Sequence, residues 1–398
     1  MRALRICFVI AIFVACAFLA ACGGGSNNAP AQTIAASAGN VASITVNGGP
    51  TGNYVDAAFT SVTVCVPGTT TCQTIDGVLV DTGSSGLRIL SSVLTIPLSQ
   101  QISGGNPIVE CFPFVSGYTW GPVQMADVEM ASEKASSVPV QVLSDTDFTA
   151  PTSCTDSGAS SDTLASLGAN GIVGVGLFTQ DCGSYCETVQ TSSGSLNLYY
   201  ECSSSTSCQP TAESLAQQVP NPVSMFATDN NGVVIELPTV SGGEEAILSG
   251  SLVFGIGTES NNALGGATVY TANDLGDFTT TFNGASDPNS FIDSGSNGYF
   301  FASSITACPS TSNAPGFYCP TAVENLSATN QGANGGSGSV SFSIANAEIL
   351  FNTPDFAYGD LGGTYSNGAF DWGLPFFFGR NVYTGLQSST NPNGYWAY

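Results

Sequence analysis

The stretch GVLVDTGSSGL at residues 77–87 contributes most to the prediction of the fold. An apolar run leads into Asp81, small and hydroxylated residues follow it, and an apolar residue resumes after the last glycine. The stretch NSFIDSGSNGY at residues 289–299 repeats this order of residue types around Asp293. The two aspartates are 293 − 81 = 212 residues apart, a period far too long for a solenoid. Two related halves are the simplest explanation.

The Asp-Thr/Ser-Gly triplet alone is a weak signal, and the chain contains its own control. The triplet DSG at residues 156–158 lies in a loop rich in Ser and Thr, and no apolar run leads into it. We interpret this third triplet as a turn. Each of the two longer stretches, in contrast, is followed by an apolar segment with glycine, at residues 171–174 and 370–373.

Strand signals dominate the rest of the chain. Short runs of β-branched and aromatic residues are broken by Gly, Asn, Ser and Pro, which predicts the all-β class with more than one barrel or sandwich. Residues 229–232 (DNNG) have the composition of a hairpin turn, and Ala212–Gln218 is the best short helix candidate. The clearest strand candidates are Ser43–Asn47, Ser61–Val66, Gly77–Val80, Val138–Leu143, Val233–Leu237, Tyr299–Phe301 and Val340–Ile344.

The N-terminus indicates export. Residues 1–21 combine two early arginines, an apolar run and small residues at the end, which is the pattern of a signal peptide. The sequence LAAC that ends at Cys22 resembles a bacterial lipobox, which implies lipidation of Cys22 and anchoring in the cell envelope, with the outer membrane as the expected membrane. An ordinary signal peptide cut before Cys22, giving a periplasmic or secreted protein, is the alternative. We expect residues 22–42 to form a flexible tether.

Charge and histidine content exclude several classes of function. After loss of the signal peptide, only Arg88, Lys134 and Arg380 remain against 29 acidic residues, so no basic patch for nucleic acid is expected. The chain has no histidine, which excludes Ser-His-Asp and Cys-His catalysis and histidine-ligated metal sites. We therefore expect chemistry based on carboxylates, without metal or cofactor.

Ten of the 13 cysteines lie beyond the lipobox, an even number that fits disulfide bonds in an oxidising compartment. A zinc site at residues 182–186 and 202–208 is the rival interpretation, but the spacing fits poorly. Connectivity does not follow from sequence alone. Spacing suggests the pairs Cys65/Cys72, Cys182/Cys186, Cys202/Cys208 and Cys308/Cys319, which leaves Cys111 and Cys154 for each other.

Two aspartates delivered by strands to one cleft could act as a catalytic pair. Carboxyls about 3 Å apart cannot both ionise, so they share a proton. The ionised Asp can then take a proton from a bound water while the protonated Asp polarises a peptide carbonyl. We predict Asp81 and Asp293 as this pair, and loop residues that support them by hydrogen bonds or close approach: Thr82, Gly83, Ser84, Ser294, Gly295 and Ser296.

These motifs resemble those of pepsin-like aspartic peptidases over nearly all of the mature chain. The two Asp stretches match, as do residues 170–176 and 372–383, and residues 224–227 look like the strand that crosses between lobes. The nearest resemblance is to a branch of bacterial lipoproteins with paired Asp-Thr/Ser-Gly-Ser motifs. It implies a bilobal β-fold with a pseudo-twofold axis and a cleft, its lobes at residues 43–222 and 223–398, and endopeptidase activity on extended polypeptides.

The family also implies a flap hairpin over the cleft, usually with a tyrosine before a glycine-rich turn. The candidate here is residues 114–121 (FVSGYTWG), where Phe114 stands in the tyrosine's place. Tyr118 and Trp120 are the other flap candidates, and each could equally be a surface or core residue.

Two classes of function follow. We predict a monomeric aspartic endopeptidase that hydrolyses polypeptide by water activated between Asp81 and Asp293, at acidic pH. The alternative is a catalytically silent pepsin-fold binding protein or inhibitor, or a structural lipoprotein of the envelope. Intact Asp loops favour the enzyme, and the atypical flap favours the alternative.

Overall fold

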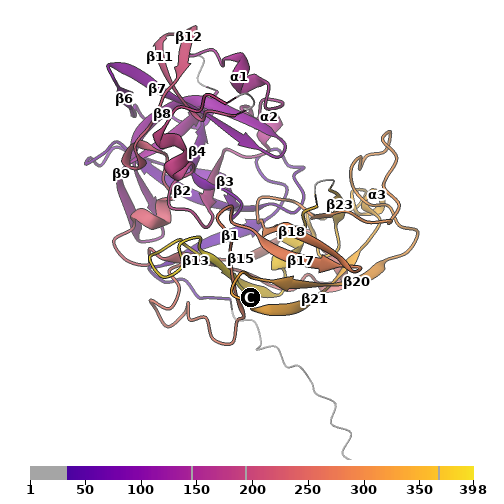
Figure 1. The fold of residues 1–398 in the computed structure, drawn as a ribbon. Helices are drawn as coiled ribbons and strands as arrows, with labels where there is room; N and C mark the ends of the chain where they lie inside the picture. The colour runs from indigo at the N-terminus through magenta and orange to yellow at the C-terminus, as the bar shows by residue number, and fades with distance from the viewer. Residues whose placement is uncertain (1–33, 145–146, 193–194, 366–367) are drawn as a thin grey trace, which may run out of the picture. The chain divides into compact units, whose positions relative to one another are not determined.

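The computed structural model describes residues 34–398, except 145–146, 193–194 and 366–367, so the signal peptide, Cys22 and part of the tether lie outside the described residues. The strands form one large, one medium and one small sheet. The large sheet contains β1 (Val41–Val46), β2 (Ala58–Cys65), β3 (Cys72–Asp81), β4 (Ser85–Leu90), β5 (Ser99–Gln100), β6 (Ile102–Ser103), β7 (Asn106–Phe114), β8 (Gly117–Met130), β9 (Glu133–Leu143), β10 (Gly171–Val175), β11 (Tyr199–Ser204), β12 (Ser207–Pro210), β13 (Gly232–Leu237), β15 (Leu248–Phe254), β16 (Val269–Thr271), β25 (Arg380–Gly385) and β26 (Tyr395–Ala397). The medium sheet contains β17 (Phe278–Phe282), β18 (Ala285–Ile292), β19 (Tyr299–Phe301), β20 (Glu324–Gln331), β21 (Ser337–Ile344), β23 (Gly362–Thr364) and β24 (Asp371–Trp372), and the small one pairs β14 (Glu244–Glu245) with β22 (Ala357–Tyr358). Figure 1 shows β17, β18, β20 and β21 side by side.

Helices are short and lie in the connections. Among the described residues, no helix is long and apolar enough to span a bilayer. The α-helices are α1 (Thr152–Thr155), α2 (Leu164–Leu167) and α3 (Ala347–Leu350), and the 3₁₀ helices are η1 (Ser91–Val93), η2 (Gly183–Glu187), η3 (Leu215–Gln217), η4 (Pro222–Met225), η5 (Ser241–Gly243) and η6 (Leu374–Phe377).

Each of the seven predicted strand runs falls on an observed strand, but the hairpin predicted at residues 229–232 is wrong. Asn221 accepts a hydrogen bond from the Val223 N–H and begins η4, so no strand precedes the turn. Residues 224–227, which resembled a strand that crosses between lobes, therefore lie in the end of η4 and a bend.

The helix predicted at residues 212–218 shrinks to η3. The Glu213 N–H bonds to the carbonyl of Cys186, which holds the preceding backbone away from helical geometry.

The strands around the two Asp loops repeat one arrangement. Strand β10 lies parallel to β3 and antiparallel to β4, so that Gly174 is opposite Asp81. Strand β24 lies parallel to β18 and antiparallel to β19, so that Trp372 is opposite Ile292, the residue before Asp293. The prediction of an all-β fold with two related lobes is confirmed. The lobe boundaries at residues 222 and 223 stay a prediction.

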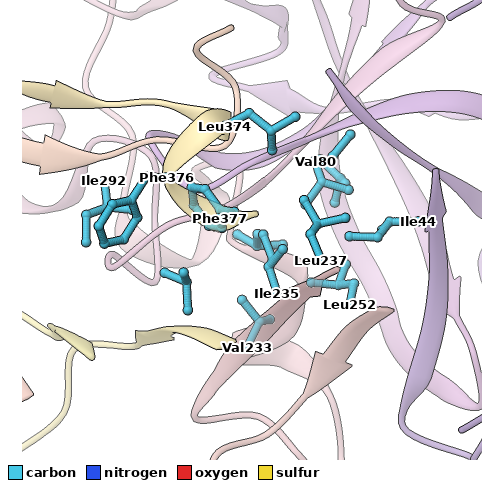
Figure 2. Close-up of a cluster of buried hydrophobic side chains, with 14 of the residues drawn as sticks. Ile44, Val80, Val233, Ile235, Leu237, Leu252, Ile292, Leu374, Phe376 and Phe377 are labelled. Atoms are coloured by element: carbon cyan, nitrogen blue, oxygen red, sulfur yellow. The ribbon is translucent and has the colours of Figure 1, made fainter. Parts of the chain in front are cut away.

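A shared apolar core anchors both loops. Val80 and Ile292, each directly before an Asp, are fully buried in the same cluster. Figure 2 shows both with Leu374 and Phe376 of η6 and with side chains of β13. Burial of a Val or Ile side chain contributes about 1.5–3 kcal/mol, so the core holds the two strand ends firmly in place.

The four disulfide pairs suggested by spacing are present, and so is the remaining pair. They are Cys65–Cys72, Cys111–Cys154, Cys182–Cys186, Cys202–Cys208 and Cys308–Cys319. The zinc interpretation of residues 182–186 and 202–208 is therefore wrong, since these cysteines bond to each other.

Candidate active site

Reciprocal hydrogen bonds lock the two Asp loops together. The Thr82 hydroxyl donates to the carbonyl of Ile292 at 3.0 Å, and the Ser294 hydroxyl donates to the carbonyl of Val80 at 2.7 Å. Each hydroxyl also accepts from the opposite backbone: the Ser294 N–H donates to Thr82 Oγ1 at 2.9 Å, and the Thr82 N–H to Ser294 Oγ at 3.1 Å. Both side chains are buried, so neither exchanges these partners for water. The loops form one rigid unit.

Each carboxylate is held by its own loop in the same way. The Gly83 N–H donates to Asp81 Oδ1 at 2.8 Å, and the Gly295 N–H donates to Asp293 Oδ1 at 2.8 Å. The outer oxygens accept from hydroxyls: Ser84 Oγ donates to Asp81 Oδ2 at 2.5 Å, and Ser296 Oγ donates to Asp293 Oδ2 at 2.8 Å. The structure thus brings all eight predicted residues of the pair and its support into one site.

Glycine is required at both positions by close approach. A Cβ on Gly83 would lie 2.7 Å from Cγ of Asp293, and a Cβ on Gly295 would lie 2.8 Å from Oδ1 of Asp81. No side chain fits at such distances, so these glycines allow each carboxyl to rest against the opposite loop.

The two carboxyls interact directly with each other. Burial raises the pKa of Asp81 well above its usual value, and the nearby Asp293 charge and a hydrogen bond between the two side chains raise this pKa further. Two like charges this close disfavour ionisation of both carboxyls at once.

A cavity of about 890 Å³ opens over the pair. Its lining includes apolar residues of both halves, such as Leu79, Ile172 and Phe291. It also includes five aspartates, Asp81, Asp181, Asp277, Asp293 and Asp371, and no Lys or Arg among the described residues. None of the described residues form a group of His, Cys, Asp or Glu side chains suited to a metal ion.

The end of the β7–β8 hairpin, the predicted flap, lines the cavity, and its three candidate residues separate. Phe114 lines the cavity and contacts Phe112 edge to face. Tyr118 and Trp120 are buried in a separate cluster, where the Trp120 indole donates to the carbonyl of Phe148. Only Phe114 of the three faces the cavity, because side chains along a hairpin point to alternate sides.

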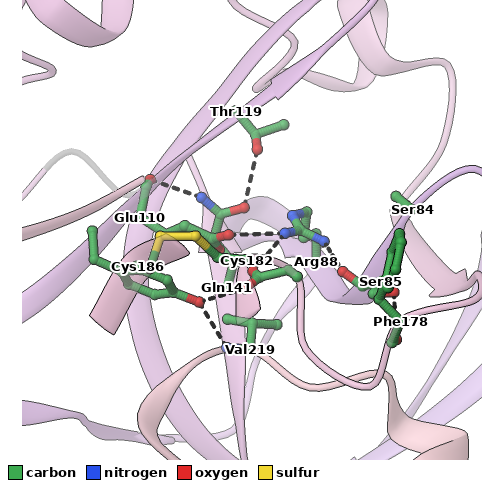
Figure 3. Close-up of polar contacts among 12 residues, drawn as sticks. Ser84, Ser85, Arg88, Glu110, Thr119, Gln141, Phe178, Cys182, Cys186 and Val219 are labelled. Atoms are coloured by element: carbon green, nitrogen blue, oxygen red, sulfur yellow. Dashed lines mark hydrogen bonds and ion pairs between the residues drawn. A yellow bond between two sulfur atoms is a disulfide. The ribbon is translucent and has the colours of Figure 1, made fainter. Parts of the chain in front are cut away.

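A buried ion network ties the flap to the Asp81 loop (Figure 3). Arg88 is fully buried, and its guanidinium donates to the carbonyl of Ser85 at 2.8 Å, to Glu110 Oε1 at 2.8 Å and to Asp181 Oδ2 at 3.0 Å. The ring of Phe112 stacks on this guanidinium at 3.7 Å. One cation therefore serves two carboxylates, and burial, followed by the Glu110 charge, raises the pKa of Asp181 well above its usual value.

Sequence reasoning missed two further residues of the site. Tyr54 lines the cavity, and burial, then the charges of Asp293 and Asp81, raise its pKa to about 12. It lies in the loop GGPTGNYVD at residues 48–56, whose composition indicates only a turn. Asp371 is 3% exposed and also lines the cavity. The paired apolar segments after each Asp loop were the available signal, since Asp371 interrupts the second of them.

Comparison with solved structures finds similarity to an aspartic proteinase from Irpex lacteus, with a TM-score of 0.49 and 15% sequence identity, covering 90% of this chain and 96% of that chain. None of the curated proteins compared with the chain matches it. A family model described as "Protein of unknown function (DUF3443)" matches residues 36–398, and the chain therefore belongs to that family.

Proposed function

We propose that this protein is an aspartic endopeptidase that uses Asp81 and Asp293 to hydrolyse peptide bonds at acidic pH. The single observation that carries the proposal is the reciprocal locking of the two Asp loops, which brings their carboxyls into hydrogen-bonding contact on the floor of a cavity. Structural roles seldom require a buried and a partly buried carboxyl to meet, because each disfavours ionisation of the other.

The reaction needs only the pair and water. The ionised member takes a proton from water, whose oxygen attacks the peptide carbon, while the protonated member donates to the carbonyl oxygen. Collapse of the tetrahedral intermediate then breaks the C–N bond as the leaving nitrogen takes a proton, which gives a carboxylic acid and an amine. Acidic pH favours the singly protonated pair. Phe114 ends strand β7, its ring lies 5.9 Å from the Arg88 guanidinium, and it covers the bound chain as an apolar lid.

The test is cleavage of an acid-unfolded protein substrate by the purified chain. We expect Asp81→Asn and Asp293→Asn each to lower kcat by at least about 10³-fold, since either change removes the shared proton or the base. Asp156→Asn is the matched control, because Asp156 has the same triplet but is exposed in a loop. Full activity in either dyad variant would refute the assignment.

Wild-type protein that binds extended peptides without cleaving them would favour the silent binding protein instead. The absence of a hydroxyl on Phe114 supports that second candidate.

We also propose that the chain is lipid-anchored through Cys22 in the cell envelope. The support is the sequence pattern of residues 1–22 together with five disulfides, which fit an oxidising compartment. Metabolic labelling with a fatty acid should mark the wild type and not Cys22→Ser. Equal labelling of both would exclude the anchor.

A further inference from the structure

Corresponding positions of the two halves differ in chemistry beside the dyad. Strand β10 places Ile172 opposite Leu79, two residues before Asp81, and strand β24 places Asp371 opposite Phe291, two residues before Asp293. All four line the cavity. An apolar wall on the Asp81 side thus corresponds to a wall with a carboxyl on the Asp293 side.

The Asp371 carboxyl is incompletely satisfied. It is 3% exposed, and its Oδ1 has no hydrogen-bond partner among the described residues. The Ser296 hydroxyl reaches the carboxyl but also donates to Asp293. Burial and the Asp293 charge raise the pKa of Asp371 well above its usual value, so both oppose ionisation of this carboxyl. An apolar residue, as at position 172, would avoid this cost.

The surroundings of Asp371 are suited to a cation from outside the chain. Asp277 lines the same cavity, and the charges of Asp371, Asp277 and Asp293 all act on Tyr365. Leu275, 73% exposed, and Phe291 add apolar surface next to these acids. Long basic side chains combine an aliphatic stem with a charged head, and this pairing of apolar and acidic surface matches them.

We infer that the pocket on the Asp293 side of the cleft selects a Lys or Arg side chain of the polypeptide substrate, with Asp371 as the specificity-determining residue. This inference rests on the proposed peptidase function. The pocket on the Asp81 side, with Ile172, Leu79 and Phe114, takes an apolar side chain. The bound ammonium or guanidinium supplies the partner that Asp371 Oδ1 lacks, and the carboxyl ionises to meet it.

The test uses peptides that carry Lys or norleucine at one of the two residues flanking the scissile bond, with phenylalanine at the other, in both orders. Norleucine has the lysine stem without the charge. Wild-type protein should prefer Lys at one of the two positions by on the order of 10- to 100-fold in kcat/KM, the range for a hydrogen bond to a charged group. At the other position it should prefer norleucine.

Asp371→Asn should abolish the Lys preference while it retains cleavage of the norleucine peptide. Asp371→Ile, which copies the residue of the other half, should reverse the preference and serves if the Asn variant folds poorly. Asp274→Asn is the matched control, because Asp274 is exposed, lies near Asp277 and is absent from the cavity lining. It should keep the wild-type ratio. An equal change for both peptides in Asp371→Asn would mean that Asp371 tunes the dyad and would overturn the inference.

A binding measurement separates this inference from the proposed function. Peptides in which a hydroxyethylene group replaces the scissile amide are titrated into wild-type protein. Tighter binding of the Lys peptide without any cleavage would support the acidic pocket and refute the peptidase. Cleavage with no Lys preference would do the reverse. If wild-type protein neither binds nor cleaves any of the peptides, both are wrong.

Discussion

The loop at Asp81 and the loop at Asp293 are held by matched hydrogen bonds, yet the walls beside them differ. Thr82 and Ser294 make equivalent bonds to the opposite backbone, and both carboxylates accept from a glycine N–H and a serine hydroxyl. Next to this symmetric frame, one half places Ile172 and the other half places Asp371. The hydrogen bonds between the two loops require the same residue types in both halves. The side chains at positions 172 and 371 take no part in those bonds between the loops, so they can differ.

The two halves also differ in what stabilises them. Four of the five disulfides and the Arg88 network lie between residues 65 and 208. The later half has one disulfide and a dense aromatic cluster, in which Phe370 stacks on Phe301 at 4.6 Å and on Trp372 at 4.1 Å. Cross-links and a buried ion network thus support the flap side, and aromatic packing supports the Asp293 side.

Alanine at the loop glycines should cause the largest loss and test the symmetry of the frame. In Gly83→Ala the new Cβ would press on the Asp293 carboxyl, and in Gly295→Ala on the Asp81 carboxyl. We expect each variant to lose about 10²-fold or more in kcat, because a displacement of the reacting groups by about 1 Å has that effect. Gly266→Ala is a control for alanine substitution in a loop, because Gly266 has nothing within 4 Å of its Cβ position and does not have a positive φ. If one of the two dyad variants keeps wild-type kcat, the halves do not contribute equally to the site.

Removal of the Arg88 guanidinium should lower the free energy of unfolding of the half that contains the flap. Arg88→Met leaves the buried Glu110 and Asp181 without a cation, and loss of one partner of a buried ion pair costs about 3–5 kcal/mol. Urea unfolding at pH 4 and pH 7 measures this loss. It should be larger at pH 7 than at pH 4, because burial raises the pKa of Asp181 and low pH favours the uncharged form of this carboxyl.

Arg380→Met is the matched change on the other half, where the partly buried guanidinium packs on the ring of Phe376 at 4.6 Å, donates to the Phe376 carbonyl at 2.6 Å and hydrogen-bonds to Tyr299. We expect a smaller loss of about 1–2 kcal/mol there, because no buried carboxylate is left without its cation. Equal losses in the two variants would contradict the idea that the halves rely on different interactions.

Stability should fall as pH rises, in contrast to most proteins. Burial is the main reason why several carboxyls have a raised pKa, including Glu213 at about 7 and Asp360 at about 6. Since the folded state binds these protons more tightly than the unfolded state, their stabilisation is complete below about pH 4 and is lost as pH rises through 6 and 7. We expect Tm to fall by on the order of 5–10 °C between pH 4 and pH 8 in calorimetric scans. The other carboxyls with strongly raised pKa values are Asp56, Asp81, Asp181 and Asp371.

Glu213→Gln should flatten the dependence of Tm on pH, because it removes a carboxyl with a raised pKa. Glu213 is buried and absent from the cavity lining, so the change leaves the cavity intact. A Tm that is highest near neutral pH would show that the buried carboxyls do not control stability.

The parts of the site that can be predicted from the sequence are those encoded by short contiguous stretches of residues. Residues 77–87 and 289–299 specify a strand, an Asp and a glycine turn locally, so the pairing of Asp81 with Asp293 could be expected from the repeat. Four of the disulfides follow from short spacings, since local loops favour nearby partners, whereas Cys111–Cys154 follows only as the remaining pair. The four short disulfides and each Asp stretch depend on residues near one another in the chain, and the long-range pairing of the two aspartates depends on the repeat.

The remaining parts depend on side chains that meet only in the folded chain. Arg88 reaches Asp181 across 93 residues, and Tyr54 approaches the dyad from a loop with no motif. The strand register of the β7–β8 hairpin decides that Phe114 and Trp120 lie on opposite faces of it. A shift of one residue would move each side chain to the other face. In the sequence, Asp371 lies within the apolar segment that follows the second Asp stretch. Only its pairing with Phe291 in the sheet places it on the cavity wall.

The smallest effect is expected from the serines that bond the outer carboxylate oxygens, and it distinguishes the two loops most finely. Ser84→Ala removes a donor from Asp81 alone, whereas Ser296→Ala removes a hydroxyl that reaches both Asp293 and Asp371. Loss of a hydrogen bond to the charged form raises a carboxyl pKa, so both variants should need a higher pH to ionise the pair. We expect kcat/KM to fall by about 3- to 10-fold, the range for one such bond, and the acidic limb of the pH–rate profile to shift to higher pH.

Only Ser296→Ala should also weaken the preference for Lys over norleucine, because the carboxyl of Asp371 becomes harder to ionise. A Lys preference that falls equally in Ser84→Ala would place the basic side chain of the substrate against the dyad itself.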